Sequence, residues 1–352
     1  MSGTSSLWWP KPDEPASLSR GLAKALLYIP SALYGQTVAN RMAMPGKQAA
    51  LPVICVGNFI AGGAGKTPTA LAIAAMMSER GIAPAFISRG YGGTLTSGST
   101  RVEPERHNAA ETGDEPLLLA RQAPTWVGTD RLASIAAASE NGARCAILDD
   151  GLQNPGVIKN LAFAVVDGRS GVGNGLCHPA GPLRAPLDRQ MDHVDAVVLI
   201  GEGNAAAPAV RRAAQRGKPV LSARMEIEVA EHLREKPVMA YCGIGRPEKF
   251  FDSLKSAGLD VVHGLHFADH HRYTKADAER LIRDAQSRNA LLVTTEKDHL
   301  RLKDAEGVLA DLANLSTAIP AQLSFEDPAY IGTLLDAAIA RWRRELLLVS
   351  ID

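Results

Sequence analysis

The chain has few cysteines, no excess charge of either sign and no long apolar run, and each shortage excludes a class of protein. Its 4 cysteines are scattered and form no CxxC pair, so we expect neither disulfides nor a zinc site, and a cytoplasmic protein is predicted. Lys plus Arg (38) equals Asp plus Glu (38), which gives no reason to expect a nucleic-acid partner. No apolar run has the length of a bilayer span, and the N-terminus lacks a signal-peptide pattern, so we expect no export.

The length of the chain and the order of its apolar runs predict two α/β units. With 352 residues, of which 46% are hydrophobic, the chain can bury one large or two medium-sized cores. Short apolar runs alternate with helical segments such as 131–141, a pattern typical of a parallel sheet covered by helices. After a first strand that begins at residue 53, strands are expected at 84–88, 125–127, 145–148, 161–166 and 196–200.

A second series of the same kind follows a charged segment at 226–236. Strands are expected at 238–242, 260–265 and 290–294, with helices between them, and a last helix is expected at 329–347. We interpret 226–236 as a linker between a larger first unit and a smaller second one.

An amphipathic helix is predicted over 14–42. Its apolar residues recur at helical spacing, with Arg20 and Lys24 on other faces. Two interpretations stay open, since the apolar stripe either lies in a membrane surface or packs on the protein core. Pro30 is expected to bend or break the helix. The stripe consists of Leu18, Leu22, Ala25, Leu26, Ile29 and Leu33.

A glycine-rich loop indicates that the chain binds a nucleoside triphosphate. Residues 53–68 have the pattern of a buried strand, a loop and a helix start that contains Gly-Lys-Thr, although a Rossmann-like turn is the alternative. Backbone N–H groups of such a loop point at the phosphates, Lys66 reaches the β and γ oxygens, and the Thr67 hydroxyl can bind Mg²⁺. The strict pattern has glycine where this chain has Ile60, so neighbouring glycines are expected to supply the flexibility. The residues expected at the nucleotide are Gly62, Gly63, Ala64, Gly65, Lys66, Thr67 and Pro68.

Two carboxylates follow the apolar strand that ends near Leu148. A metal ion opposite the hydroxyl of a P-loop needs acids at a strand end, so Asp149 or Asp150 is expected to hold Mg²⁺. Which of the two binds the ion directly stays open, and a solvated turn is the alternative.

Phosphoryl transfer to an alcohol also needs a group that accepts the hydroxyl proton. Asp114, in a turn with two carboxylates, is the candidate. His270, in the only His-rich segment, is a candidate to orient Asp114 or share the proton, although a metal cluster or an exposed loop would also fit that segment.

Taken together, these segments resemble the tetraacyldisaccharide 4′-kinase family. The motifs occur in the order of that family over nearly the whole chain, which is far more specific than any one of them. They are Gly-Asn-Phe at 57–59, Gly-Gly-Ala-Gly-Lys-Thr-Pro at 62–68, Ser-Arg-Gly-Tyr-Gly at 88–92, Gly-Asp-Glu-Pro at 113–116, Asp-Asp-Gly-Leu-Gln at 149–153, Pro-Ala-Gly-Pro-Leu-Arg at 179–184, Asp-His at 269–270 and Thr-Glu-Lys-Asp at 295–298.

The resemblance implies ATP-dependent phosphorylation of the 4′-hydroxyl of a lipid A disaccharide 1-phosphate, which gives lipid IVA. It implies ATP and Mg²⁺ as cofactors, Asp114 as base with His270 as its partner, and the acids Asp149 and Asp150 near Mg²⁺. It also implies Arg184 near the phosphates and Gln153 near the nucleotide. The reaction would take place at the cytoplasmic face of the bacterial inner membrane, to which the protein would bind peripherally. This favours membrane docking of the N-terminal helix, and no obligate protein partner is evident.

The family also implies two α/β/α units joined by a two-stranded linker. We therefore expect a P-loop kinase core over 1–225 that includes the helix at 14–42, a linker over 226–236 and a smaller α/β domain over 237–318. A return strand and a C-terminal helix are expected over 319–352.

The main rival function is a nucleotide switch or ATP-driven assembly factor built on the same loop. A guanine-specific switch would normally carry Asn-Lys-x-Asp after a late strand. Here the run 290–294 is followed by Thr-Glu-Lys-Asp, so the guanine pattern is not met and ATP is favoured. The role of 295–298 stays open.

Overall fold

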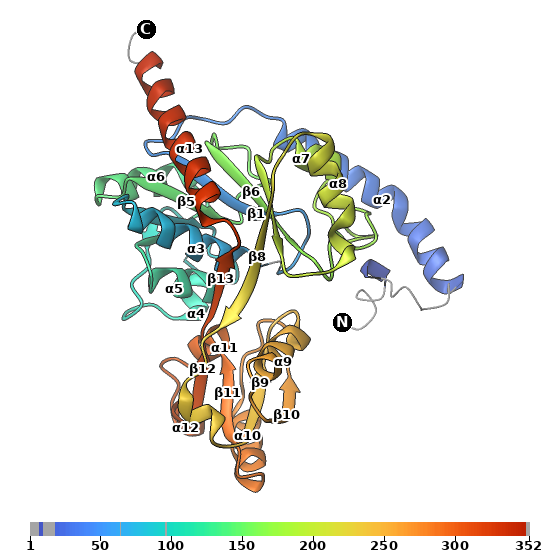
Figure 1. Cartoon of the computed structure of the whole chain (residues 1–352), viewed down its shortest axis with the longest axis vertical. Coiled ribbons are helices and arrows are strands. Elements are labelled where there is room, and N and C mark those ends of the chain that lie inside the picture. Colours follow the sequence, from blue (N-terminus) through green and yellow to red (C-terminus); the bar gives the residue numbers. More distant parts are fainter. Residues whose placement is uncertain (1–6, 10–17, 64, 96, 350–352) are drawn as a thin grey trace.

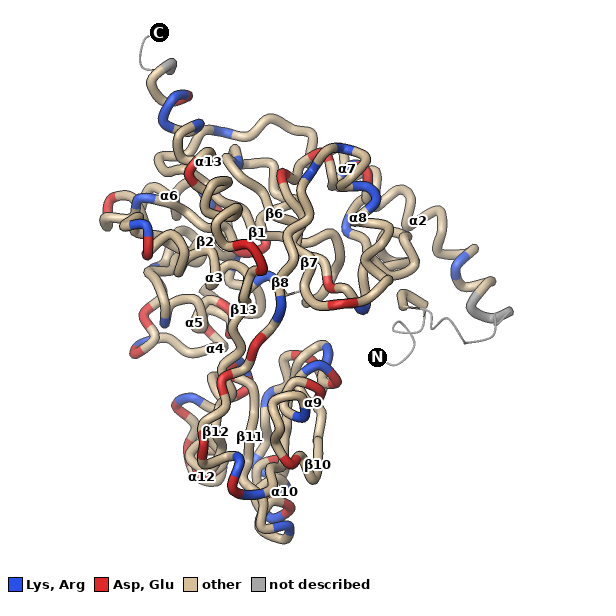
Figure 2. The backbone as a smooth tube through the Cα atoms, in the orientation of Figure 1, with Lys and Arg blue, Asp and Glu red and all other residues tan. Residues whose placement is uncertain are grey.

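Two β-sheets of unequal size, each covered by helices, form the chain in the computed structural model (Figure 1). The structure describes residues 7–9, 18–63, 65–95 and 97–349. Both sheets are mostly or wholly parallel, so the predicted α/β class is confirmed. Lys and Arg are interspersed with Asp and Glu over both parts of the molecule (Figure 2), in keeping with the zero net charge of the sequence.

The large sheet has the strand order β13-β8-β7-β6-β1-β5-β2-β4-β3. The outermost pairs, β13 with β8 and β3 with β4, are antiparallel, and the pairs between them are parallel. Every residue of β1, β2, β5 and β6 is buried, because helices cover both faces of the sheet. The strands are β1 (Val53–Asn58), β2 (Pro84–Ser88), β3 (Thr100–Arg101), β4 (Thr125–Val127), β5 (Cys145–Asp149), β6 (Leu161–Asp167), β7 (Ala196–Ile200), β8 (Val220–Ile227) and β13 (Ala321–Phe325).

Helices divide between the two faces of the large sheet. Apolar side chains of α3 and α13 pack on one face, and those of α6, α7 and α8 pack on the other. The helical segments of this part are α3 (Lys66–Glu79), α4 (Ala109–Thr112), α5 (Asp114–Ala120), α6 (Arg131–Glu140), α7 (Leu187–Met191), η1 (Asn204–Ala206), α8 (Ala207–Gln215) and α13 (Pro328–Val349).

The small sheet is parallel throughout, with the order β10-β9-β11-β12. Side chains of α9 pack on one face and those of α10 and α12 on the other, so this sheet has cores of its own. Its elements are η2 (Glu231–Arg234), β9 (Val238–Cys242), α9 (Pro247–Ser256), β10 (Val261–His266), α10 (Lys275–Ser287), β11 (Leu291–Thr295), α11 (Glu296–Arg301), α12 (Val308–Leu315) and β12 (Ser316–Ile319).

The chain crosses between the two sheets twice, and the crossings lie side by side. The first crossing follows β8, and the second passes through Pro320 from β12 into β13. The strands β8 and β13 pair antiparallel, and the N–H group of Glu228 donates to the carbonyl of Pro320 at 3.2 Å. The last helix, α13, then packs on the large sheet.

The N-terminal helix α2 (Leu18–Met42) turns its predicted apolar stripe to solvent. Leu22, Leu26, Ile29 and Leu33 are 64%, 71%, 68% and 65% exposed, whereas residues near the C-terminal end of the helix, such as Val38, are buried. Figure 1 shows the helix extending beyond α7 and α8, away from the large sheet. Among the described residues, no helix combines the length and apolar character that crossing a bilayer requires. The start of the predicted helix, 14–17, lies outside the described residues.

The helix α2 runs unbroken through Pro30, so the prediction that this residue breaks it was wrong. A proline removes one backbone hydrogen bond, and here the freed carbonyl belongs to the turn that contains the exposed Leu26, where water can reach it. The next turns are held by tertiary contacts. Ser31 donates through its hydroxyl to the carbonyl of Cys177 at 2.7 Å, and a Cβ at Gly35 would lie 2.6 Å from the Cys177 sulfur.

Candidate active site

The glycine-rich loop connects β1 to α3. Backbone hydrogen bonds with the segment 179–184 hold the start of this loop. The N–H group of Ala61 donates to the carbonyl of Pro182 at 2.7 Å, and the N–H group of Arg184 donates to the carbonyl of Phe59 at 2.9 Å. Ile60, which stands where the strict pattern has glycine, forms a β-bridge with Leu183 and is buried. The first loop position is therefore a paired, strand-like residue that does not need the freedom of glycine.

Flexibility enters the loop two residues later. Gly62 and Gly65 have φ values of 105° and 91°, a region that favours glycine. A Cβ at Gly65 would also lie 2.5 Å from Cδ1 of Ile200, so the chain requires glycine there. Gly63 has no positive φ, and the predicted loop residue Ala64 lies outside the described residues. Pro68 occupies the first turn of α3, where a missing N–H group leaves no helical acceptor unpaired.

Lys66 and Arg184 both reach Asp150, the second acid after β5. Lys66 is 8% exposed, and its Nζ lies 3.8 Å from Oδ2 of Asp150. Arg184 donates to both oxygens of that carboxylate, at 2.9 and 2.8 Å, in a bidentate pair. Burial alone would raise the pKa of Asp150, but the charges of Lys66 and Arg184 hold it below its usual range. Two cations therefore share one carboxylate at the mouth of the phosphate-binding loop.

Gln153 lies behind Arg184 and fixes its orientation. Its side-chain oxygen accepts a hydrogen bond from Nη1 of Arg184 at 3.1 Å. Its amide nitrogen donates to the carbonyl of Asn58 at 2.7 Å and to the side chain of Gln190 at 2.8 Å. Both N–H bonds of the amide are thus used inside the protein, and the side-chain oxygen is bound to Arg184.

Asp149, the last residue of β5, faces Thr67 and keeps one carboxylate oxygen without a partner among the described residues. The Thr67 hydroxyl lies 3.4 Å from Oδ2 of Asp149. The other oxygen, Oδ1, is buried and has no hydrogen-bond partner among the described residues. Burial, together with the carboxylates of Glu115 and Asp150, raises the pKa of Asp149, while Lys66 opposes the rise. An unpartnered carboxylate oxygen beside a threonine hydroxyl fits the ligand set of Mg²⁺.

No other metal cluster competes with this position. In the part of the chain that the structure describes, no three His, Cys, Asp or Glu side chains gather as a possible metal site. A Mg²⁺ ion at Asp149 and Thr67 would therefore take its remaining ligands from phosphate oxygens and water, as is usual for this ion.

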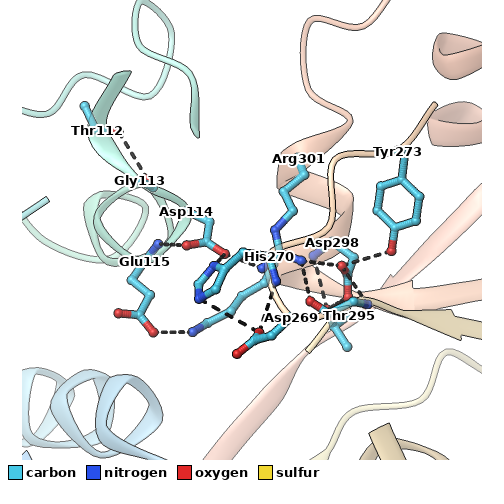
Figure 3. A network of polar contacts seen from close by, with 12 residues as sticks. Thr112, Gly113, Asp114, Glu115, Asp269, His270, Tyr273, Thr295, Asp298 and Arg301 are labelled. Carbon is cyan, nitrogen blue, oxygen red and sulfur yellow. Dashed lines mark hydrogen bonds and ion pairs between the residues drawn. The ribbon is translucent and has the colours of Figure 1, made fainter. Parts of the chain in front are cut away.

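Asp114 and His270 meet across the two sheets (Figure 3). Asp114 is the first residue of α5 and is 5% exposed, while His270 follows β10 on a loop of the small sheet. Nδ1 of His270 lies 3.3 Å from Oδ2 of Asp114. The turn before Asp114 requires glycine, because Gly113 has φ of 89° and a Cβ there would lie 2.6 Å from the carbonyl oxygen of Tyr91. The two residues that the sequence named as a dyad are thus brought together.

The contact between Asp114 and His270 shifts the pKa of each residue in the direction that favours its charged form. Burial alone would raise the pKa of Asp114, but the hydrogen bond with His270 and the charge of Arg301 hold it far below its usual range. The same hydrogen bond raises the pKa of His270, and partial burial opposes this rise. The carboxylate of Asp114 is consequently ionised over the whole physiological pH range.

Two cations of α11 that sequence reasoning missed also reach the Gly-Asp-Glu-Pro turn. Nη2 of Arg301 lies 2.5 Å from Oδ2 of Asp114, and Nζ of Lys297 lies 2.6 Å from Oε1 of Glu115. Burial would lower the pKa of Lys297, but Glu115 and Asp114 raise it, so the lysine stays charged. The positive charge of Lys66 also lowers the pKa of Glu115, and the charge of Asp114 raises it. Glu115 therefore interacts with charged groups of both the glycine-rich loop and the Asp114–His270 pair.

A second contact joins the two sheets at the end of β6. Asp167 is 1% exposed and binds two side chains of the small part, Arg246 at 3.1 Å and Lys249. Arg246 also lies over the ring of Trp9, 5.6 Å from its centroid. Beside them, the exposed Arg169 and Asp252 form an ion pair at 3.0 Å. The contacts between the sheets thus include several ion pairs, and the buried Leu300 of α11 adds an apolar contact with Leu117 and Leu118 of α5.

The sequence did contain a signal for α11. Thr-Glu-Lys-Asp follows an apolar run, as a helix start at a strand end does, and the hydroxyl of Thr295 accepts from the N–H group of Asp298 as the helix cap. Arg301 lies three residues beyond Asp298 and pairs with it at 2.6 Å, a spacing that an acid-to-base pattern on a helix predicts. What the spacing alone does not reveal is the partner in the large sheet.

Comparisons with known proteins agree with the motifs. The family model described as tetraacyldisaccharide-1-P 4′-kinase matches residues 23–340. A protein of Methylobacterium nodulans named tetraacyldisaccharide 4′-kinase is 50% identical over 339 residues, which cover 96% of this chain and 94% of that protein. A protein of Bradyrhizobium diazoefficiens with the same name is 44% identical over 341 residues, which cover 96% of this chain and 97% of that protein.

One solved structure shares the fold over nearly its full length. The crystal structure of LpxK from Aquifex aeolicus in complex with ATP matches with a TM-score of 0.69 and 24% sequence identity. The match covers 90% of this chain and 99% of that one. At this identity the likeness concerns the fold, and it confirms the expected P-loop kinase architecture.

Proposed function

The chain belongs to the tetraacyldisaccharide 4′-kinase family, and from this premise we propose how its residues bring about the reaction. It is a kinase of lipid A biosynthesis that uses ATP to phosphorylate the 4′-hydroxyl of tetraacyldisaccharide 1-phosphate. A nucleotide switch or assembly factor is not favoured, because the matching family and relatives are kinases. The observation that best supports the site is the meeting of Asp114 and His270 across the two sheets, beside a P-loop.

The glycine-rich loop holds the phosphates of ATP. Its backbone N–H groups and the first turn of α3 offer the donors, and Lys66 supplies a cation to the β and γ oxygens. Arg184 adds a second positive charge, which the entering phosphates draw from its pair with Asp150. The nucleotide-binding residues are Gly62, Gly63, Ala64, Gly65, Lys66, Thr67 and Pro68, with Gln153 acting through Arg184.

Asp149 and Thr67 would hold Mg²⁺, with Asp150 close by. The support is the unpartnered Oδ1 of Asp149 and the neighbouring hydroxyl. The ion supplies charge neutralisation on the β- and γ-phosphate oxygens when it is bound. Asp150, whose two oxygens are taken by Arg184, serves to orient the cations of the loop.

Asp114 accepts the proton of the 4′-hydroxyl, and His270 orients its carboxylate. Both stay in hydrogen-bond reach of each other at 3.3 Å, and Asp114 is ionised and therefore able to accept. A depressed pKa makes the carboxylate a weak base, but phosphoryl transfer depends mainly on positioning and on charge stabilisation. The approach of the small sheet brings His270 to the site and also excludes water, which limits idle hydrolysis of ATP.

The exposed stripe of α2 lies in the membrane surface at the cytoplasmic face of the bacterial inner membrane. A face that exposes Leu22, Leu26, Ile29 and Leu33 to water is costly unless something apolar covers it. The acceptor carries four acyl chains, so it is presented to the enzyme at a bilayer surface. The helix thus holds the kinase where its acceptor lies, as a peripheral protein.

The test is transfer of label from γ-labelled ATP to tetraacyldisaccharide 1-phosphate in mixed micelles. Wild type is compared with Asp114→Asn and with a matched control, Asp336→Asn, which changes an exposed aspartate of α13. We expect Asp114→Asn to lose about 10² to 10⁴ in rate with ATP affinity unchanged, and the control to keep full activity. Full transfer by Asp114→Asn would refute Asp114 as the base. ATP hydrolysis by wild type without any lipid phosphorylation would restore the switch hypothesis.

A further inference from the structure

Arg301, the last residue of α11, lies in the candidate site yet has no part in the reaction as described above. It is 7% exposed on its side chain, and its guanidinium contacts residues of both sheets. We infer that Arg301 is a positioning residue that joins the arrival of the small sheet to the orientation of Asp114 and His270. This inference rests on the proposed role of Asp114 as the base.

The inner side of the guanidinium is fixed by a fully buried acid. Nη1 of Arg301 donates to Oδ1 of Asp298 at 2.6 Å, and Asp298 has no exposed surface. Asp298 is itself held by three other donors: the Thr295 hydroxyl at 2.6 Å, the Gly243 N–H group at 3.0 Å and the Tyr273 hydroxyl at 3.0 Å (Figure 3). A carboxylate with this many partners cannot turn, so it fixes the arginine in one orientation.

The outer side of the guanidinium reaches the base. Nη2 of Arg301 lies 2.5 Å from Oδ2 of Asp114, the same oxygen that faces Nδ1 of His270. The other oxygen, Oδ1, accepts from the N–H group of Glu115 at 3.0 Å. Arg301 therefore settles which oxygen of Asp114 faces the histidine.

The same guanidinium holds the loop that carries His270. Nη1 of Arg301 donates to the carbonyl of Gly243 at 2.7 Å, and the backbone N–H group of His270 donates to that carbonyl at 3.1 Å. His270 has φ of 57°, a left-handed conformation that a residue with a side chain adopts only when its surroundings impose it. One arginine thus touches the acid of the dyad and the carbonyl that fixes the backbone of the histidine.

Every partner of Asp114 except Glu115 comes from the small sheet. The charged groups that face Asp114 are His270 on its loop, Arg301 and Lys297 on α11, and Glu115 next in the chain. When the two sheets are apart, Asp114 loses three of these four neighbours and keeps only the like charge of Glu115. The carboxylate then lacks the groups that orient it and lower its pKa, so the base is complete only when the sheets have closed.

The experiment compares Arg301→Met, which removes both the positive charge and the planar guanidinium with its several donors, with Arg301→Lys, which keeps only the charge. The matched control is Arg169→Met, which removes an exposed ion pair between the same two sheets but touches neither dyad residue. Measured for each are the thermal midpoint, the Kd for ATP, and kcat and KM for tetraacyldisaccharide 1-phosphate, from the lowest pH at which the protein stays folded to about pH 9, because the pKa of Asp114 lies far below its usual range.

We expect Arg301→Met to lower kcat about 10- to 100-fold with the Kd for ATP unchanged, because a misplaced base costs this much in rate. The acidic limb of its kcat profile should move to higher pH, since removal of the arginine charge raises the pKa of Asp114. For Arg301→Lys, kcat should fall only in part, and the acidic limb of the kcat profile should stay at the pH of wild type. The control should stay within about twofold of wild type.

Both dyad residues titrate, so the profiles are repeated in a His270→Asn background. Any difference that Arg301→Met still makes to the acidic limb then belongs to Asp114. If Arg301→Met does not fold, Arg301→Lys decides on its own: a normal kcat would overturn the inference, and a lower kcat with an unmoved limb would support it.

Failure of the inference can be told from failure of the proposed base. If Asp114→Asn is inactive while Arg301→Met keeps both kcat and its acidic limb, the base stands and Arg301 has no positioning role. If Arg301→Met and Arg301→Lys lose rate equally and neither limb moves, the arginine only stabilises the fold, which also overturns the inference. If Asp114→Asn is fully active, the premise itself is wrong.

Discussion

The acids of the site differ in what surrounds them, and we expect each to have a different task. Asp114 and Asp150 are each clamped by an arginine, whereas Oδ1 of Asp149 has no partner among the described residues. A buried carboxylate without a partner costs stability when it is ionised. Asp149 is therefore the acid whose ionised form gains most from a bound cation.

Asp149→Asn is expected to abolish Mg²⁺-dependent transfer and to raise the thermal midpoint of the protein free of metal and nucleotide. The folded-state pKa of Asp149 lies above the ordinary value of 3.8 because of burial and the neighbouring carboxylates. An acid with a raised folded pKa favours folding at low pH, and this contribution is lost as pH rises through that pKa. Asparagine loses nothing in that range, so the advantage of the variant should grow with pH.

The measurement is the thermal midpoint of both proteins at about pH 5 and pH 8, with and without Mg²⁺ and ATP. Mg²⁺ with ATP should raise the midpoint of wild type more than that of the variant. An equal loss of stability in the variant at both pH values would contradict the prediction, since it would mean that Asp149 is a satisfied structural acid.

Among the secondary-structure elements, α2 has its apolar stripe and its buried residues on opposite sides. Leu26→Asp combined with Ile29→Asp is expected to weaken binding to vesicles of bacterial phospholipid at least tenfold, because each of these side chains loses its transfer into the apolar layer. Both positions are exposed, so the thermal midpoint should not fall.

Ala32→Asp is the control, since it adds an aspartate at an exposed position of the same helix that does not belong to the apolar stripe. Co-sedimentation with vesicles measures binding, and transfer to a soluble acceptor analogue measures catalysis apart from binding. Unchanged sedimentation of the double variant would show that the stripe does not contact lipid.

The elements show how far sequence reasoning reaches. Central strands such as β1 and β7 were predicted closely, because strands buried on both faces are continuous apolar runs. The strand β8 was missed, because it mixes buried residues with exposed charges such as Arg224 and Glu226, next to a segment interpreted as a linker. The periodicity of α2 predicted a helix with one apolar side, but no periodicity says whether that side meets protein or solvent.

The same limit of sequence reasoning applies to the residues of the site. The residues of the P-loop are neighbours in the sequence, and so are the two acids after β5. Each group forms a local pattern typical of its chemistry, so these candidates could be named from the sequence. Asp114 and His270 were candidates from the residues themselves, and the family resemblance implied that they act as a pair. Arg301 is 187 positions from Asp114, and only the packing of two separate sheets brings them together. No spacing rule reaches over that distance.

At the scale of the whole molecule, two cores are joined by a contact that is partly polar and partly apolar. The clusters that contain β9 and β11 are separate from the two main clusters of the large sheet, and the contacts between the sheets include several ion pairs, although Leu300 of α11 also packs with Leu117 and Leu118 of α5. We therefore keep the division into a P-loop domain and a smaller α/β domain as a proposal, with the prediction that calorimetry resolves two transitions.

The variant Leu254→Ala in α9 tests which of the two transitions belongs to the small domain. Leu254 is fully buried in the small core, so its truncation should cost about 2–5 kcal/mol of unfolding free energy in that part alone. One transition should then shift down, while ATP with Mg²⁺ should shift only the other one up. A single transition with equal calorimetric and van't Hoff enthalpies would show instead that the two sheets unfold as one unit.

The contact of α2 with Cys177 has a consequence for how the rate of this enzyme depends on its acceptor. Cys177 begins the short segment that ends at Arg184, so the helix bearing the apolar stripe and the proposed phosphate-binding arginine are fixed to the same piece of backbone. An enzyme held at a lipid layer by such a helix searches in two dimensions. Its velocity should follow the mole fraction of acceptor in the layer, and dilution with inert lipid should slow it even when the bulk concentration of acceptor is constant.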